Sequence, residues 1–335
     1  MIAPRKFLGV CALTAGLLVG FNALVHWSAR GSLPRKLRQR IAAGSDIQVT
    51  AVGNSVVEAG FNPTEFSQNW RGDGPSPKAF NAGLGSTSQV EHYLVARQVL
   101  SHQTQSKRII YGFFDLMLTE DLKVRLSDFY GNRCLSFIYE PDLAARFITE
   151  SGWERTIFPY LARVPIYVER GTLWAKVEQQ RRRFGELGLT ARASNQFGRV
   201  EDFSALEIPA AAEFRSLCRK SVLQHRPICP PIDLFFREAA AQNAQIYVVA
   251  MPMRLKHRDQ TYDSPEWAEY WKYLATQLAP YHAILIPAGD WIPDDQFADP
   301  VHLGPSGAVQ FSRRLAVTIS ELERQSRPIS SPKSG

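Results

Sequence analysis

Three residues of types that can together activate a hydroxyl group lie in two stretches of the 335-residue chain. Ser55 follows the short apolar run 47–52 through a Gly53-Asn54 turn, and Asp299 and His302 lie three positions apart near the other end. Acyl transfer by a serine needs a base that takes the hydroxyl proton and a carboxylate that orients this base. We therefore expect Ser55 as nucleophile, His302 as base and Asp299 as the orienting carboxylate. The alternatives are that Ser55 caps a helix and that the Asp-Pro-x-His loop is a structural turn.

A glycine-rich turn supplies candidate donors for a developing oxyanion. It runs from Asn81 to Ser88 and contains Gly83 and Gly85. Backbone N–H groups of Gly83 and Ser55 are the expected donors to the negative oxygen of a tetrahedral intermediate. A dinucleotide-binding loop is disfavoured, because Ser88 stands where that fingerprint has a third small residue and no acidic residue follows at the required distance.

Short apolar segments alternate with helical patterns along the chain. The expected strands cover 47–52, 78–83, 108–114, 245–251 and 283–287, and the expected helices cover 89–100, 231–243, 265–279 and 305–323. Continuous apolar strands that alternate with helices predict a parallel sheet covered by helices on both faces. The carboxyl ends of such strands carry the ligand site, which is where Ser55 is expected.

The alternation is interrupted between the third and fourth strands. Residues 118–229 form a predicted, mainly helical insertion that is rich in aromatic and basic residues, with a helix-like stretch at 171–187. We interpret it as a cap or wall of the cleft whose aromatics chiefly form a core. The expected organisation is an anchor at 1–29, a basic linker at 30–45, a catalytic domain at 46–324 that includes the insertion, and a disordered tail at 325–335.

The amino-terminal run 7–27 is apolar and long enough to cross a bilayer as a helix. No good cleavage site follows, so an uncleaved signal-anchor is favoured over a removed signal peptide. Two basic residues precede the run and five follow it, namely Arg30, Arg35, Lys36, Arg38 and Arg40. A bare count by the positive-inside rule would place the large domain in the cytoplasm, which conflicts with the periplasmic location expected below.

The three chemical blocks resemble those of the SGNH/GDSL hydrolase superfamily. Gly53-Asn54-Ser55-Val56 is similar to its first block, Asn81-Ala82-Gly83 to its second and Asp299-Pro300-Val301-His302 to its last. The resemblance implies a flavodoxin-like, three-layer α/β/α fold with a five-stranded parallel sheet and a Ser-His-Asp acyl-transfer centre. Together with the anchor and the insertion, it is similar to membrane-anchored members that act in O-acylation of exopolysaccharides or other envelope polymers, often beside a multispanning acyltransferase.

One stretch departs from this pattern. The third block of the family supplies a Gly-x-Asn whose amide donates to the oxyanion, whereas the matching stretch here is Tyr111-Gly112-Phe113-Phe114-Asp115. An ionised Asp115 would repel an oxyanion, so we interpret it as a helix cap or as an acceptor for a substrate hydroxyl. Asn54 and Asn81 are further candidates for substrate binding.

Two other function classes remain open at this point. A non-catalytic polysaccharide-binding or assembly subunit would keep the same fold and anchor, and the altered blocks favour it. A cytoplasmic-facing esterase acting on lipids is the reading suggested by the basic residues after the anchor. Transfer and hydrolysis differ only in the acceptor, so the sequence does not separate them.

Composition sets the remaining expectations. The net charge of +7 comes with no zinc pattern, basic recognition helix or RNA-binding motif, so no nucleic-acid partner is expected. The four cysteines and the scattered histidines have no metal-ligand spacing, and neither a metal nor a cofactor is expected. Cys218 and Cys229 could bridge a loop, but free structural thiols fit their positions equally well.

Overall fold

The computed structural model describes residues 4–85, 87–102, 108–122, 124, 140–149, 152–169, 173, 177, 211–299 and 301–326. Its chain divides into two compact units. One contains Met1–Arg40 and Leu122–Arg192, and the other contains Ile41–Asp121 and Ala193–Gly335. The predicted insertion 118–229 is thus shared between the units, since its residues 122–192 group with the amino-terminal segment and the others with the sheet. Of the helix predicted around 171–187, Leu173 and Val177 are described, and both are helical. The predicted disordered tail 325–335 is wrong at Gln325, which ends the last helix, and its residues 327–335 lie outside the described residues.

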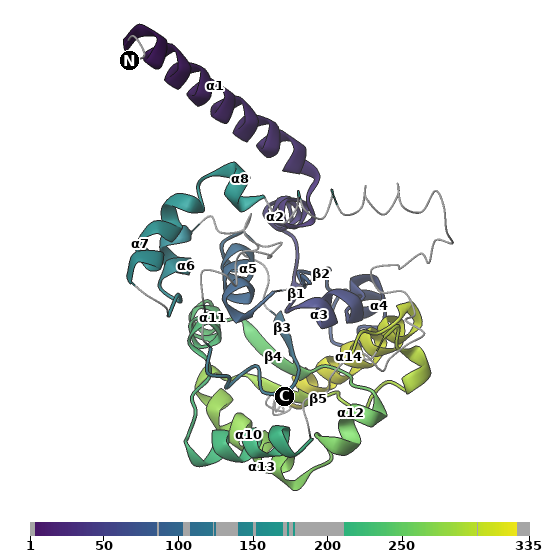
Figure 1. The fold of residues 1–335 in the computed structure, drawn as a ribbon. Coiled ribbons are helices and arrows are strands. Elements are labelled where there is room, and N and C mark those ends of the chain that lie inside the picture. The colour runs from purple at the N-terminus through teal and green to yellow at the C-terminus, as the bar shows by residue number, and fades with distance from the viewer. Residues whose placement is uncertain are drawn as a thin grey trace, which may run out of the picture. The chain divides into compact units, whose positions relative to one another are not determined.

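The larger unit is built on a five-stranded parallel sheet (Figure 1). Its strands are β1 (Val49–Val52), β2 (Ala79–Asn81), β3 (Arg108–Phe113), β4 (Gln245–Ala250) and β5 (Ile284–Pro287), in the order β2-β1-β3-β4-β5. All neighbouring pairs are parallel. The five predicted strands and the three-layer α/β/α class are therefore confirmed.

Helices cover both faces of this sheet. The helices of this unit are α3 (Ser55–Gly60), α4 (Pro63–Gln68), α5 (Gln89–His102), α10 (Ala211–Leu223), α11 (Pro230–Ala241), α12 (Leu255–Gln260), α13 (Pro265–Leu278) and α14 (Pro305–Gln325). Alternate residues of each strand point to opposite faces. Ile110 therefore packs in a core with Phe311 and Leu315 of α14. Tyr111 instead contacts the rings of Phe235 and Phe236 of α11.

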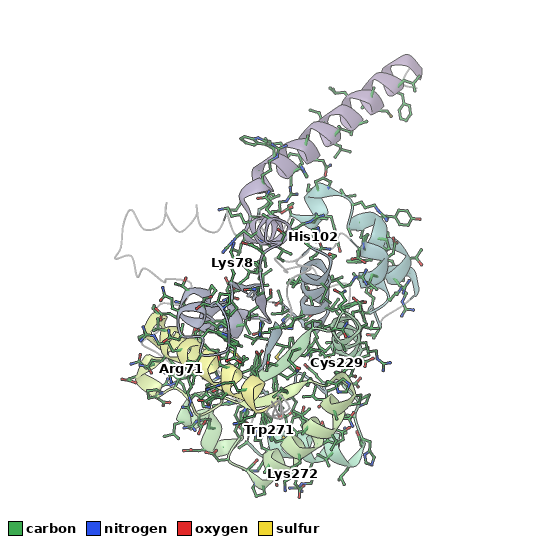
Figure 2. All side chains as sticks on the ribbon, turned by 180° about the vertical axis from the view of Figure 1, so that it is seen from behind. Arg71, Lys78, His102, Cys229, Trp271 and Lys272 are labelled. Atoms are coloured by element: carbon green, nitrogen blue, oxygen red, sulfur yellow. The ribbon has the colours of Figure 1, made fainter. Side chains whose placement is uncertain are left out.

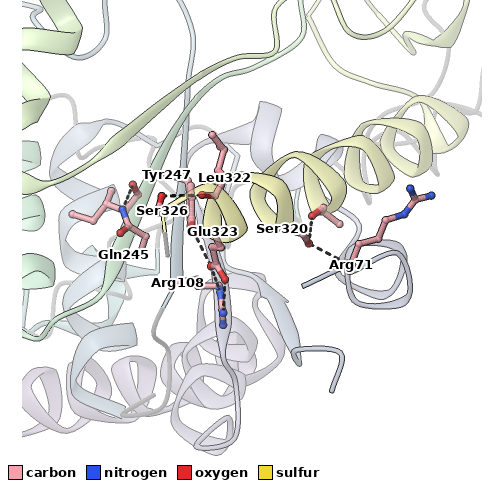
Figure 3. A network of polar contacts seen from close by, with 10 residues as sticks. Arg71, Arg108, Gln245, Tyr247, Ser320, Leu322, Glu323 and Ser326 are labelled. Carbon is pink, nitrogen blue, oxygen red and sulfur yellow. Dashed lines mark hydrogen bonds and ion pairs between the residues drawn. The ribbon is translucent and has the colours of Figure 1, made fainter. Parts of the chain in front are cut away.

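Helix α14 is fastened to the sheet at the strand ends opposite Ser55. Arg108, the first residue of β3, donates to both carboxylate oxygens of Glu323, and the Tyr247 hydroxyl donates to the same carboxylate at 2.9 Å (Figure 3). The Arg108 guanidinium also lies 4.9 Å from the centre of the Trp70 ring. These contacts fix the carboxyl end of α14, and its amino end begins directly after the loop that carries His302.

The smaller unit begins with a long apolar helix. Helix α1 (Pro4–Ser28) continues through a 3-10 turn at Ala29–Gly31 to α2 (Leu33–Ala43), most of which belongs to this unit. The segment Phe7–Gly31 is long and apolar enough to cross a membrane. In the part of this unit that the structure describes, further helices are α6 (Pro141–Ala145), α7 (Gly152–Leu161) and α8 (Pro165–Val168).

Candidate active site

Ser55 begins helix α3 immediately beyond the carboxyl end of β1. The cap of this helix is Asn54, whose side-chain oxygen accepts the Val56 N–H at 3.1 Å. The alternative that Ser55 serves as the cap is therefore not what the structure shows. A glycine is needed at the turn, because a Cβ on Gly53 would lie 2.5 Å from a methyl group of Val57 and 2.8 Å from the Gly112 carbonyl oxygen.

Asp299 and His302 share the loop that precedes α14. One Asp299 carboxylate oxygen accepts the backbone N–H groups of Val301 and His302, at 3.0 and 2.8 Å. The other lies 2.7 Å from Nδ1 of His302. Burial by itself would raise the pKa of Asp299, but the hydrogen bonds from the His302 ring and from these N–H groups lower it below its usual value. Asp299 is thus held as an ionised acceptor; Pro300 lies outside the described residues.

The His302 ring connects this carboxylate to the candidate nucleophile. Its Nε2 atom lies 2.7 Å from Oγ of Ser55. A carboxylate at Nδ1 fixes the proton of a neutral imidazole on that nitrogen, so Nε2 is left as an acceptor for the serine proton. The structure therefore brings together the three residues that the sequence singled out, in the order serine, imidazole and carboxylate. His302 and Asp299 are both mostly buried, with 19% and 16% of their side chains exposed.

The predicted oxyanion donor at Gly83 needs correction. Its N–H donates to the Asn81 side-chain oxygen at 2.8 Å, so this donor is already used inside the protein. Asn81 also donates through Nδ2 to the backbone oxygens of Val57, Glu58 and Phe61. The Asn81 side chain therefore ties the end of β2 to α3, and this role differs from the expected substrate contact.

The next glycine of the turn passes beside Ser55. A Cβ on Gly85 would lie 3.5 Å from Cβ of Ser55, which places this backbone next to the candidate nucleophile. The Gly85 N–H donates to a Glu58 carboxylate oxygen at 2.6 Å. The N–H of Ser55 itself has no acceptor among the residues that the structure describes. Of the two expected oxyanion donors, Gly83 and Ser55, the Ser55 N–H is thus the one that remains available.

Asp115 is not a helix cap, and one of its carboxylate oxygens is engaged inside the protein. It occupies a turn after β3 with a positive φ of 49°. Its Oδ1 atom lies 2.9 Å from Nε2 of His257 and accepts the Tyr262 hydroxyl at 3.0 Å. Burial first, and the Asp115 charge second, raise the pKa of Tyr262 well above its usual value, so the phenol stays protonated and donates. Both partners bind Oδ1, so a substrate hydroxyl, the contact expected of Asp115, would meet the other carboxylate oxygen.

A buried histidine supports the glycine-rich turn. His92 of α5 is only 1% exposed, and its ring nitrogens lie 3.0 Å from Oγ1 of Thr87 and 3.1 Å from the Tyr111 hydroxyl. Thr87 also donates to the Leu84 carbonyl at 2.6 Å. Burial lowers the pKa of His92 to about 3, so the ring is neutral. His92 is one of the scattered histidines for which the sequence predicts no site, although its place in the first turn of the helix after the glycines is a usable signal.

The cysteines that the structure describes form no disulfide and no metal-binding cluster. Cys218 and Cys229 are free, buried thiols, and Cys229 is labelled in Figure 2. Burial raises the pKa of each to about 12, which makes both poor nucleophiles at neutral pH. In the described part of the chain, no three His, Cys, Asp or Glu side chains are grouped so that they could hold a metal ion.

Comparisons with known proteins add little to this geometry. No family model and no curated protein matches the chain. Fifteen solved chains match in structure. One is a Bacteroides fragilis protein described as a "putative acylhydrolase", with 8% sequence identity, a TM-score of 0.39, and coverage of 87% of this chain and 96% of that one. Likeness at this level does not carry over to function, so the chemistry must be argued from the site.

Proposed function

We propose that this chain is a membrane-anchored acyl-transfer enzyme that works through an acyl-enzyme on Ser55. The observation that carries the proposal is the 2.7 Å contact between Nε2 of His302 and Oγ of Ser55, with Asp299 on the other ring nitrogen. A serine that only stabilised the fold would not need an imidazole nitrogen at its hydroxyl and, behind that imidazole, a carboxylate whose pKa is lowered.

In the proposed reaction, Oγ of Ser55 attacks the carbonyl carbon of an acyl ester while Nε2 of His302 takes the hydroxyl proton. Asp299 stabilises the imidazolium, and the Ser55 N–H donates to the oxyanion. Collapse of the tetrahedral intermediate breaks the ester C–O bond, and His302 returns the proton to the departing alcohol. A second hydroxyl, from a sugar or from water, then attacks the acyl-enzyme by the reverse sequence.

The proposed substrate is an acylated envelope polymer or exopolysaccharide, and the proposed location is the periplasmic face of a bacterial inner membrane. The apolar helix within Phe7–Gly31 supports anchoring. A multispanning acyltransferase is the partner that would supply acyl groups to such an enzyme. A reporter fused after Gly335 tests the orientation: activity confined to the cytoplasm contradicts the periplasmic location and favours a cytoplasmic-facing esterase.

Labelling with an active-site fluorophosphonate tests the nucleophile. We expect stoichiometric modification at Ser55 and turnover of a chromogenic acetate ester, both abolished by Ser55→Ala. Ser101→Ala is the control, because Ser101 is exposed and donates only to local groups of α5. Undiminished turnover by Ser55→Ala would refute the proposal.

The second candidate is a non-catalytic polysaccharide-binding or assembly subunit. It is favoured by the state of the oxyanion region, where the Gly83 N–H bonds to Asn81, the Gly85 N–H bonds to Glu58, and Asp115 replaces an amide. Such a subunit needs no activated hydroxyl. Failure of the fluorophosphonate to react, together with retained binding of an acylated polysaccharide, would support this second function.

A further inference from the structure

Helix α7 of the smaller unit exposes an apolar face. Trp153, Ile157 and Tyr160 are 63%, 39% and 68% exposed. They are spaced four and three residues apart, so they lie on one side of the helix. Phe158, one position from Ile157, is fully buried on another side. Exposed Trp and Tyr side chains in a row are typical of surfaces that contact a membrane interface. Each has an apolar ring body and a polar edge, which suits the boundary between acyl chains and headgroups.

A basic hollow adjoins this face. It has a volume of about 320 Å³ between α6 and α7, and Tyr160 belongs both to its lining and to the apolar row. Its charged lining residues are Arg146, Arg155 and Arg163, against the single carboxylate of Asp142. Asp142 is 3.3 Å from Arg163, and the pair is weak because both side chains are mostly exposed to solvent. The hollow therefore has the charge to receive an anionic headgroup beside an apolar surface.

Helix α8, which follows α7, is hydrogen-bonded to the apolar helix α1. The Ile166 N–H donates to the side-chain oxygen of Asn22 at 3.0 Å, and Asn22 donates in turn to the Leu18 carbonyl. Asn22 is five residues before Trp27, or about 8 Å along a helix. If Trp27 marks the end of a membrane span, Ile166 lies at the depth of about 5–10 Å that interfacial helices reach.

A buried ion pair holds α8 in this position. Glu169, whose side chain is fully buried, binds Arg35 of α2 at 2.6 Å. The Arg35 guanidinium also lies 3.2 Å from Nδ1 of His26 near the end of α1. Breaking a buried pair is strongly destabilising, because one charge is left without its partner. The carboxyl end of α8 is therefore fixed near the end of the apolar helix.

We infer that α6–α8 form a second membrane contact that lies on the bilayer surface: the α7 row of Trp153, Ile157 and Tyr160 enters the headgroup–acyl boundary, and the arginine-lined hollow binds an anionic phospholipid headgroup. This inference rests on the proposal that α1 spans the membrane. The contact would fix the tilt of the smaller unit against the bilayer, because the unit would then meet the membrane at the spanning helix and at α7.

Spin labels on the full-length protein in proteoliposomes test this contact. Cysteines are introduced singly at Trp153, Ile157 and Tyr160, with the accessible native cysteines replaced by serine. A label at Leu17 of α1 gives the lipid reference and one at the exposed Lys272 gives the water reference. We expect the three α7 labels to be more accessible to oxygen, which partitions into lipid, than to a water-soluble nickel chelate, as for Leu17.

Each other outcome contradicts the inference in a distinguishable way. If the α7 labels behave like Lys272 while Leu17 meets lipid, the surface contact is absent although the anchor stands. Low accessibility of the α7 labels to both reagents indicates a protein partner or a second copy in place of lipid. If Leu17 does not meet lipid, the anchor and this contact both fail, whereas Ser55 labelling by the fluorophosphonate is unaffected.

The hollow is tested by the charge of the lipid. In vesicles that contain phosphatidylglycerol, we expect the label at Tyr160 to lie deeper than in pure phosphatidylcholine. The double variant Arg146→Gln/Arg163→Gln should lose this difference. Lys256→Gln, which removes an exposed charge from the larger unit, should keep it. A difference that persists in the double variant would overturn the headgroup site.

Discussion

Nε2 of His302 lies 2.7 Å from Oγ of Ser55, although 247 positions separate the two residues in the chain. The contact is possible because Ser55 begins the helix after β1 and His302 lies in the loop before α14, and α3 and α14 pack on the same face of the sheet. The two segments come together through the core that Val57 shares with Leu303, the neighbour of His302.

The first prediction concerns Asp299. Asp299→Asn keeps the shape of the side chain but favours the wrong imidazole tautomer, since an amide can donate to Nδ1. We expect kcat for a chromogenic ester to fall by about 10²–10⁴ while the fold is retained. Asp259→Asn, at an exposed carboxylate, is the matched control and should have wild-type kcat. Equal kcat values for the two variants would contradict the orienting role.

The second prediction concerns Asn81. Asn81→Asp is nearly isosteric, but it removes the donor to three backbone oxygens of the α3 region and places a charge beside them. Buried acceptors that lose their donor cost about 1–3 kcal/mol. We expect the free energy of unfolding in urea to fall by at least about 2 kcal/mol on this basis. Asn243→Asp, at an exposed asparagine, is the control, and we expect little change in its free energy of unfolding. A stable Asn81→Asp protein that binds substrate poorly would instead support the original expectation of a substrate contact.

Part of this site could be predicted from the sequence. The five strands were found because buried parallel strands are continuous apolar runs. Ser55 and His302 could be singled out as candidate catalytic residues because Ser55 directly follows a strand and His302 lies in the short loop before the last helix. The acceptor of the Gly83 N–H was not found, because it depends on the side-chain conformation of Asn81, and no sequence period encodes this. The pairing of Asp115 with His257 depends on tertiary packing in the same way, and no local pattern at either residue indicates the other.

The division of the chain into units also escaped sequence reasoning. Residues 118–229 differ in composition from the alternating strands and helices, so their sequence predicts one insertion. In the structure, α7 groups with the amino-terminal helices, whereas α10 belongs with the sheet. Phe214 of α10 packs against the rings of Tyr262 and Trp267, and such contacts between distant aromatic residues leave no local pattern.

The third prediction concerns Asp115. Asp115→Asn weakens the charge-assisted bonds with His257 and Tyr262, so we expect the free energy of unfolding to fall by about 1–3 kcal/mol. We expect kcat to stay within about threefold of wild type, far below the change of about 10²–10³ that accompanies loss of an oxyanion donor. A tenfold or larger rise in kcat would show that the Asp115 charge acts on the reaction and would contradict its assignment to the His257–Tyr262 network.

The last prediction concerns the pH dependence conferred by His92. Burial lowers its pKa to about 3 in the folded protein, whereas an unfolded histidine has a pKa near 6.5. Between these values the unfolded chain binds a proton that the folded chain does not, so the free energy of unfolding falls as the pH drops, by up to about 1.4 kcal/mol per pH unit. Above pH 6.5 this contribution is constant.

Urea unfolding at several pH values between 7 and 4 measures this slope. His92→Gln removes the titrating group and should make the slope shallower in that window, while it lowers stability at pH 7 because Thr87 and Tyr111 lose a partner. His102→Gln, at an exposed histidine of the same helix, should keep the wild-type slope. If His92→Gln and wild type lose stability equally on acidification, the neutral, buried ring cannot be what holds the glycine-rich turn beside Ser55.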